Sequence, residues 1–203
     1  MGEAAARREP EVPSAAWLTR LPPATRFAFH GGAEARAAAH SVWGVAFSEE
    51  ACRANALAPR ATLWMGPDEY LLLDFSRSGP PGDPQLGGPV FDALEGAMAA
   101  VPHALVDISH RQFACEVFGP HATTILSGAC PLDLDLAEFP VGMCTRTVLA
   151  KADVALWRTR TDAFHLEVWR SFAGYVTGVL TEIAAEFYSP ESRPLSPAND
   201  NDS

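Results

Sequence analysis

The sequence has little positive charge, no long apolar run and no close pair of cysteines, and each shortage excludes a class of protein. Its 15 Lys and Arg residues stand against 25 Asp and Glu, which gives a net charge of −10. That charge opposes the attraction to phosphate on which nonspecific nucleic-acid binding depends. The longest apolar stretches fall far short of the ~20 residues that a membrane-spanning helix needs. We therefore expect neither a nucleic-acid partner nor a membrane span.

The cysteines are few and scattered. Cys52, Cys115, Cys130 and Cys144 form no CxxC pair, the arrangement from which zinc and iron-sulfur sites usually start. We predict no metal site and four reduced thiols, as is usual in a cytoplasmic protein. The opening residues lack the apolar segment of a secretory signal, so cytoplasm is the expected location.

Motifs for independent chemistry are also lacking. No GxGxxG or Walker A sequence occurs, so we expect no cofactor bound by this chain alone. Ser109 and His110 resemble a nucleophile beside its base, but consecutive side chains of an extended segment point to opposite faces. Asp133, Asp135 and Glu138 alternate with leucines, which favours a half-exposed strand over a cation site. The sequence thus predicts no catalytic, cofactor-binding or metal-ligating residue.

Apolar periodicity predicts mixed strands and helices between two loose ends. Residues 1–20 and 189–203 are expected to be a flexible N-terminal arm and C-terminal tail, and the Gly- and Pro-rich residues 76–89 a surface loop. Strands are expected at residues 61–65, 70–75, 104–108, 115–118, 145–150, 153–158 and 163–168, and helices from about residues 89, 119 and 171.

A weak internal repeat suggests how these elements are organised. Leu63-Trp64 in the first predicted hairpin resembles Leu156-Trp157 in the last, and each hairpin is followed by a helix. We therefore predict an α+β domain at residues 21–188, built from two similar halves, about 60–110 and 111–188. Each half would lay helices on one face of an antiparallel sheet.

The most distinctive run is CPLDLDLAEFPVGMCTRT, residues 130–147, followed by FHLEVWRSFAGYV at residues 164–176. With the VDISH segment before them, these residues resemble the gamma subunit of bacterial heterotetrameric sarcosine oxidase, from about residue 104 to residue 187. The resemblance implies a fold related to the folate-binding domain of aminomethyltransferases. It also implies a small noncatalytic subunit of a complex that demethylates sarcosine oxidatively.

Further expectations rest on the same resemblance. The complex would form glycine, hydrogen peroxide and 5,10-methylenetetrahydrofolate, using FAD, FMN, NAD and tetrahydrofolate bound in other subunits and no cofactor in this chain. The partners would be the alpha, beta and delta subunits. Two alternatives stay open: an independent folate-binding aminomethyltransferase-like protein, and the equivalent subunit of a related N-methyl amino acid oxidase or dehydrogenase.

Folate chemistry in this chain is disfavoured by one strand. Where the resembling transferases carry acidic residues, one of them catalytic, the counterpart here has Trp157 and Arg158.

A subunit of this kind needs an interface. This acidic chain gathers several arginines near the distinctive run, which fit either a solvated rim or an interface in which arginine pairs with carboxylate or phosphate. Gly174 and Gly178, four residues apart on the last helix, are interpreted as a strip that lets another backbone approach. The suspected interface residues are Arg146, Arg170, Pro140, Gly142, Met143 and Cys144.

Overall fold

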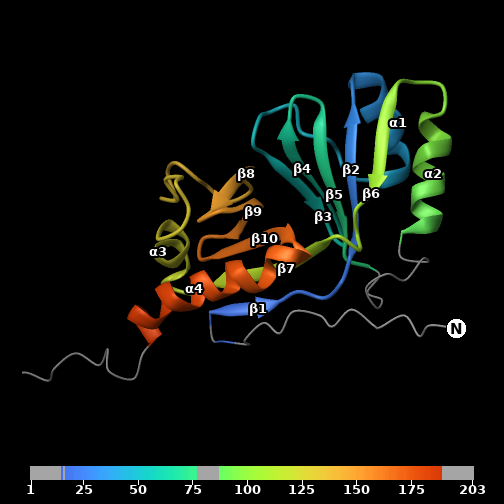
Figure 1. Cartoon of the computed structure of the whole chain (residues 1–203). Helices are drawn as coiled ribbons and strands as arrows, with labels where there is room; N and C mark the ends of the chain where they lie inside the picture. Colours follow the sequence, from blue (N-terminus) through green and yellow to red (C-terminus); the bar gives the residue numbers. More distant parts are fainter. Residues whose placement is uncertain (1–14, 16, 77–86, 189–203) are drawn as a thin grey trace, which may run out of the picture.

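The computed structural model describes residue 15, residues 17–76 and residues 87–188. The predicted C-terminal tail, most of the predicted N-terminal arm and most of the predicted loop at 76–89 lie outside these residues. Within them the chain forms two five-stranded antiparallel sheets (Figure 1).

The first sheet has the order β3-β4-β5-β2-β6. Its strands are β2 (Thr25–Gly31), β3 (Ala54–Leu57), β4 (Arg60–Gly66), β5 (Glu69–Asp74) and β6 (His103–Asp107), and its helices are α1 (Ala33–Trp43) and α2 (Gly88–Met98). Alternation places Phe27, Phe29 and Leu72 on one face, where they pack with Trp43, Leu94 and the rest of the two helices. Both helices therefore cover the same face, on the outside of the molecule in Figure 1.

The second sheet has the order β1-β7-β10-β9-β8. Its strands are β1 (Leu18–Arg20), β7 (Gln112–Phe118), β8 (Cys144–Leu149), β9 (Ala152–Arg160) and β10 (Ala163–Trp169). Helix α3 (Ala122–Ser127), the short 3-10 turn η1 (Arg170–Phe172) and helix α4 (Ala173–Tyr188) complete this half. Phe164, Leu166 and Val168 of β10 join Val176 and Leu180 of α4 in the largest core cluster.

The two sheets repeat one plan. Read from opposite ends, the orders β3-β4-β5-β2-β6 and β8-β9-β10-β7-β1 correspond strand by strand, and each half has a helix after its first strand and another after its hairpin. The predicted class, two similar antiparallel-sheet and helix halves, is confirmed. The N-terminal strand β1 takes the place in the second sheet that β6 takes in the first, so the halves are interlocked.

The inner faces of the two sheets meet in a third apolar cluster. Leu63 and Leu71 of the first sheet lie there with Cys144 of the second, and Trp64 and Trp157 of the repeated dipeptides pack against them. The layers are therefore helices, sheet, sheet, helices. The repeat noticed in the sequence marks the junction between the halves.

Several local expectations differ from the structure. Residues 18–20, assigned to the N-terminal arm, form β1, because Leu18 is fully buried against β7. The first half begins at β2, well before residue 60, and no sequence pattern noted above predicts β2, α1 or β3.

One further interpretation is wrong. Residues 133–138 form no strand and end in a turn, because the carboxylates of Asp133 and Asp135 accept hydrogen bonds from the backbone N–H groups of Asp135 and Ala137. Gly174 and Gly178 have open space around them, so no backbone of the described chain uses that strip, and the approach of another backbone there stays a prediction. None of the helices described reaches the length and apolarity of a membrane span.

Candidate functional site

The Ser109-His110 pair is a structural strand end, as the sequence predicted. The Ser109 hydroxyl is buried and accepts a hydrogen bond from the backbone N–H of Arg26 at 2.8 Å. The backbone N–H of Ser109 in turn donates to the Asp107 carboxylate at 2.8 Å. His110 is exposed. The serine therefore fixes the end of β6 to the start of β2 and is not presented as a nucleophile.

A buried ionic group joins the halves next to this serine. Arg26 of β2 and Glu167 of β10 are 2% and 1% exposed, and the Arg26 Nε lies 2.9 and 2.7 Å from the two Glu167 carboxylate oxygens. His165 Nε2 lies 2.8 Å from one of them, and Arg26 also donates to the carbonyl oxygen of Ala24. Burial alone would raise the pKa of Glu167, but Arg26 and His165 more than offset it and lower that pKa. No pattern in the sequence indicated this pair, whose members lie 141 positions apart.

The segment from Pro140 to Cys144 is a second junction between the halves. Ala54 N–H donates to the Gly142 carbonyl at 2.9 Å, Cys144 N–H donates to the Cys52 carbonyl at 2.9 Å, and Met143 forms an isolated bridge with Arg53. Gly142 takes a φ of 86°, a conformation that favours glycine. Burial raises the pKa of Cys144 to about 12. The Cys144 thiol therefore packs inside this chain and offers no side chain to a partner.

Arg158, at the position discussed for folate chemistry, is buried too. Its guanidinium donates to the Phe139 carbonyl and to the Thr123 hydroxyl, at 2.5 and 3.0 Å, and lies over the ring of Phe164. It holds the distinctive run against the sheet. The Arg158 side chain therefore stabilises the fold and faces no open site.

The two suspected interface arginines lie in different surroundings. Arg146 projects from β8 with 61% of its side chain exposed and forms an ion pair with Glu69 at 2.6 Å. Arg170 is partly buried in η1, where its backbone N–H donates to the Arg111 carbonyl at 2.9 Å.

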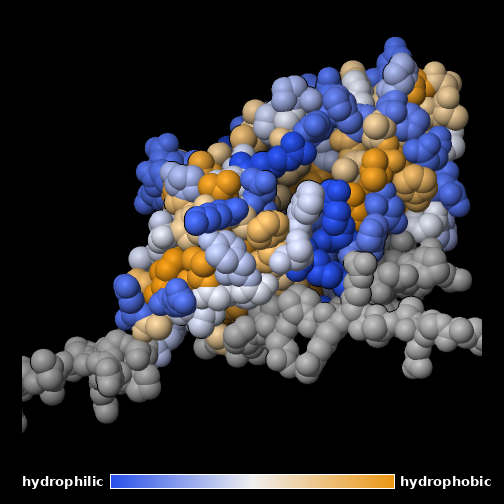
Figure 2. Space-filling view, in the orientation of Figure 1, coloured by the Kyte–Doolittle hydropathy of each residue, from blue (hydrophilic) through white to orange (hydrophobic). Residues whose placement is uncertain are grey.

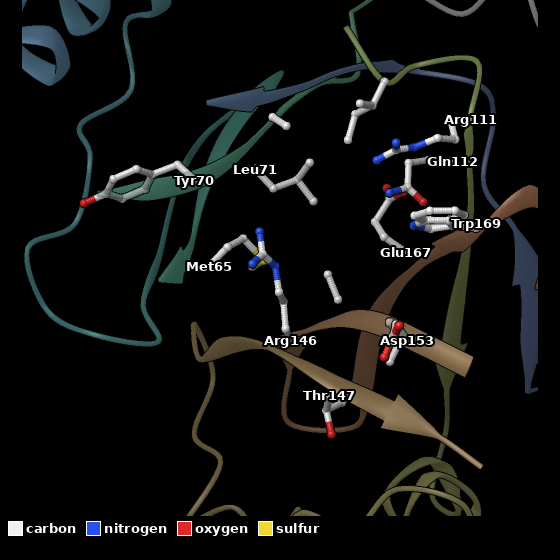
Figure 3. A pocket seen from close by; sticks show the side chains of 14 residues that line it. Met65, Tyr70, Leu71, Arg111, Gln112, Arg146, Thr147, Asp153, Glu167 and Trp169 are labelled. Atoms are coloured by element: carbon white, nitrogen blue, oxygen red, sulfur yellow. The ribbon is translucent and has the colours of Figure 1, made fainter. Parts of the chain in front are cut away.

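Arg146 also lines a cleft between the inner faces of the sheets. The cleft measures about 340 Å³. Figure 2 shows this side of the molecule hollowed between the halves, with hydrophobic side chains inside and hydrophilic ones along the rim. The lining residues are Ala28, Met65, Tyr70, Leu71, Ile108, Arg111, Gln112, Arg146, Thr147, Asp153, Val154, Ala155, Glu167 and Trp169. In Figure 3, Arg111 and Gln112 lie on one side of the space, and Met65 and Leu71 lie across from them.

No metal-binding group is apparent among the residues described. Residues 15, 17–76 and 87–188 contain no cluster of three or more His, Cys, Asp or Glu side chains able to hold an ion. The cysteines of this part are unpaired thiols, three of them buried.

The overall fold resembles that of an aminomethyltransferase. Over 80% of this chain and 44% of the other, the structure superposes on the glycine cleavage system aminomethyltransferase T from Bartonella henselae with a TM-score of 0.57 and 12% identity. This is a likeness of fold. The chain is thus an α+β protein whose fold resembles that of an aminomethyltransferase, with two interlocked antiparallel halves and a cleft between them.

The particular family is shown by sequence. Residues 31–186 match the sarcosine oxidase, gamma subunit family, and the chain belongs to it. It is 32% identical to sarcosine oxidase subunit gamma of Corynebacterium sp. (strain U-96), over 64% of this chain and 59% of that one. It is 31% identical to the Arthrobacter sp. subunit gamma, over 68% and 63%. This chain thus spans about 60% of the length of these curated relatives.

A solved structure supports the same assignment. A chain of the heterotetrameric sarcosine oxidase from Corynebacterium sp. U-96, in complex with pyrrole 2-carboxylate, superposes with a TM-score of 0.74. The two chains are 28% identical, and the match covers 84% of each.

Proposed function

We propose that this chain is the small noncatalytic subunit of a cytoplasmic heterotetrameric sarcosine oxidase. Its partners are the alpha, beta and delta subunits, which bind FAD, FMN, NAD and tetrahydrofolate. The complex converts sarcosine to glycine with formation of hydrogen peroxide and 5,10-methylenetetrahydrofolate. Membership of the gamma subunit family carries this proposal, together with the superposition on a chain of a heterotetrameric relative.

An exposed group of aromatic side chains supports the proposal of a subunit. Trp169, Phe172 and Tyr175, here called the aromatic patch, are 47%, 42% and 41% exposed. Trp and Tyr dominate the centres of protein interfaces, because they bury much apolar surface at a low cost in conformational entropy. We assign the aromatic patch, with Arg170 between its members, to the interface with a partner subunit.

We keep Arg146 and the segment from Pro140 to Cys144 as part of an interface, with fewer side chains in direct contact with the partner. Arg146 presents its exposed guanidinium to the partner, while Gly142 and Cys144 act by holding the shape of the segment. Val141 adds an apolar side chain that is 46% exposed. A carboxylate of the partner would then replace Glu69 as the neighbour of Arg146.

Co-expression of this chain with the other three subunits tests the proposal. An affinity tag on the alpha subunit should retain this chain in stoichiometric amount. The variant Trp169→Ala/Phe172→Ala should weaken association at least tenfold, since hot-spot aromatics contribute about 2 kcal/mol or more. Val106→Ala is the matched control, because Val106 is 53% exposed on β6 of the other half. A wild-type chain that fails to associate refutes the proposal, whereas an unaffected patch variant refutes only the interface.

Independent folate binding is the second candidate, favoured by the shared fold with an aminomethyltransferase. Calorimetric titration of the isolated chain with tetrahydrofolate separates the two. Saturable tight binding favours the transferase, and no heat favours the subunit. In a related N-methyl amino acid oxidase or dehydrogenase, the substrate would be chosen by a partner chain, and turnover of the assembled complex on different amines identifies it.

A further inference from the structure

The cleft between the sheets contains polar groups that the fold itself does not use. Arg111 lies 4.6 Å over the ring of Trp169, and Asp153 is exposed on β9. In the part of the chain that the structure describes, neither of these two charges has an ion-pair partner. The Gln112 side-chain oxygen is buried without a hydrogen-bond partner there. A buried acceptor without a hydrogen bond is unfavourable, and a donor of a ligand would satisfy it.

The other charges that line the cleft are already compensated. Glu167 is bound by Arg26, and Arg146 pairs with Glu69. Among the residues that the structure describes, the cleft therefore offers a ligand one cation and one anion without ion-pair partners, and one acceptor without a hydrogen bond.

Strand register fixes how these groups are spaced. Gln112 pairs with Trp169 across β7 and β10, and Val168 pairs with Val154 across β10 and β9, so the next residue, Asp153, follows Trp169 in the same row. Gln112 and Asp153 are then two strand spacings apart, about 10 Å. The anion and the orphan acceptor thus stand at opposite ends of one row, with an indole ring between them.

The middle of the cleft is apolar and open because small side chains face it from both sheets. Ala155 lies next to Glu167 on the second sheet, and Ala28 pairs with Leu71 on the first. Met65 and Ile108 complete the apolar wall. In Figure 3 the Arg111 guanidinium points into the space from one side, and Asp153 lies on the far side of Trp169 from Gln112.

We propose that this cleft binds a small dipolar molecule, one with a carboxylate and a protonated amine separated by a short apolar chain. The carboxylate pairs with Arg111, whose stacking on Trp169 holds the guanidinium in place. The amine pairs with Asp153, the apolar chain lies against the wall formed by Met65, Leu71 and Ile108, and a donor of the ligand or a bridging water reaches the Gln112 oxygen. Charges separated in this way distinguish the ligand from an α-amino acid, whose two charged groups are too close together to span the row.

Calorimetry on the full chain tests this with 6-aminohexanoate as the probe, and with hexanoate and hexylamine as probes that each lack one charge. We expect saturable binding of 6-aminohexanoate at about millimolar concentration, and binding at least tenfold weaker for both single-charge probes. Sarcosine should not compete. This outcome is independent of subunit assembly, so it stands apart from the proposed function.

Two variants with matched controls locate the site. Arg111→Met and Asp153→Asn should each weaken 6-aminohexanoate binding about tenfold, because a charged contact is lost. Arg160→Met and Asp162→Asn should leave it unchanged, since these exposed residues lie at the far end of β9 and in the turn after it. No heat up to about 10 mM probe overturns the proposal. Equal affinity for hexanoate and 6-aminohexanoate would also overturn it, as would equal binding of 6-aminohexanoate by all four variants.

Discussion

Replacing Arg26 should reveal how strongly the two halves are held together. Arg26→Met removes a guanidinium that is 2% exposed and leaves the Glu167 carboxylate, 1% exposed, with His165 as its remaining side-chain partner. Breaking a buried pair on one side costs about 3–5 kcal/mol, because an uncompensated charge stays buried. For a chain of this size that loss corresponds to a fall in Tm of roughly 6–20 °C. Circular dichroism during thermal and urea unfolding measures both quantities.

The control is an ion pair on the surface of the same sheet. Arg160→Met removes a side chain that is 58% exposed and forms an ion pair with Glu116. Exposed pairs of this kind contribute about 0–1 kcal/mol to stability. An Arg26→Met variant that is no less stable than Arg160→Met would refute the reasoning. The double variant Arg26→Met/Glu167→Leu should recover most of the loss, because apolar side chains can replace a buried pair at little cost.

The stability lost in Arg26→Met should depend on pH. Glu167 has a pKa lowered in the folded protein, so its contribution to wild-type stability is present above the unfolded value, about 4.3, and is lost as the pH falls through the lowered pKa. In Arg26→Met, burial instead favours the protonated acid, so the ionised form destabilises the fold at neutral pH. The stability gap between wild type and variant should therefore be widest near pH 7 and narrow towards pH 4. A gap that is constant with pH would exclude Glu167 as the cause.

Three further predictions concern the distinctive run and its surroundings. Arg158→Met should cost about 2–4 kcal/mol in urea unfolding, since the Phe139 carbonyl loses a charged donor inside the core; a loss below about 0.5 kcal/mol would contradict this. Gly142→Ala should cost about 1–2 kcal/mol through backbone strain alone, because open space surrounds the position and its φ is 86°; an unchanged midpoint would refute it. Burial raises the pKa of Cys144 to about 12, so a thiol reagent at pH 8 should modify the partly exposed Cys52 first, and early labelling of Cys144, read by mass spectrometry, would contradict its burial.

The sequence predicted what depends on local pattern. The hairpin β4–β5 was predictable because two short apolar runs flank a Gly-Pro-Asp-Glu turn. Helix α4 was predictable in its buried stripe, where Val176 and Leu180 are fully buried, but Phe172, which was expected in that stripe, lies in η1 just before the helix and is exposed. Periodicity reports that a residue is apolar and on a face, and it does not report whether this chain or a partner covers that face.

What depends on distant pairing could not be predicted. Strand β1 has three residues and pairs with β7, about a hundred positions away, so nothing local distinguishes it from the arm before it. The cleft is similar, because Arg111 and Asp153 come together only when the two sheets are registered. The Arg26 and Glu167 pair illustrates the same point, since each looks like an ordinary exposed charge in a strand until its partner is known.

The native mass of the purified complex, determined by mass spectrometry with and without this chain, shows most directly whether the chain is an integral subunit. We expect one assembly that contains this chain with the alpha, beta and delta subunits. Omitting this chain should leave an incomplete or unstable assembly with lower sarcosine turnover. A three-subunit assembly that forms without this chain, with full flavin content and full turnover, while this chain stays alone in solution, would contradict the proposed subunit role.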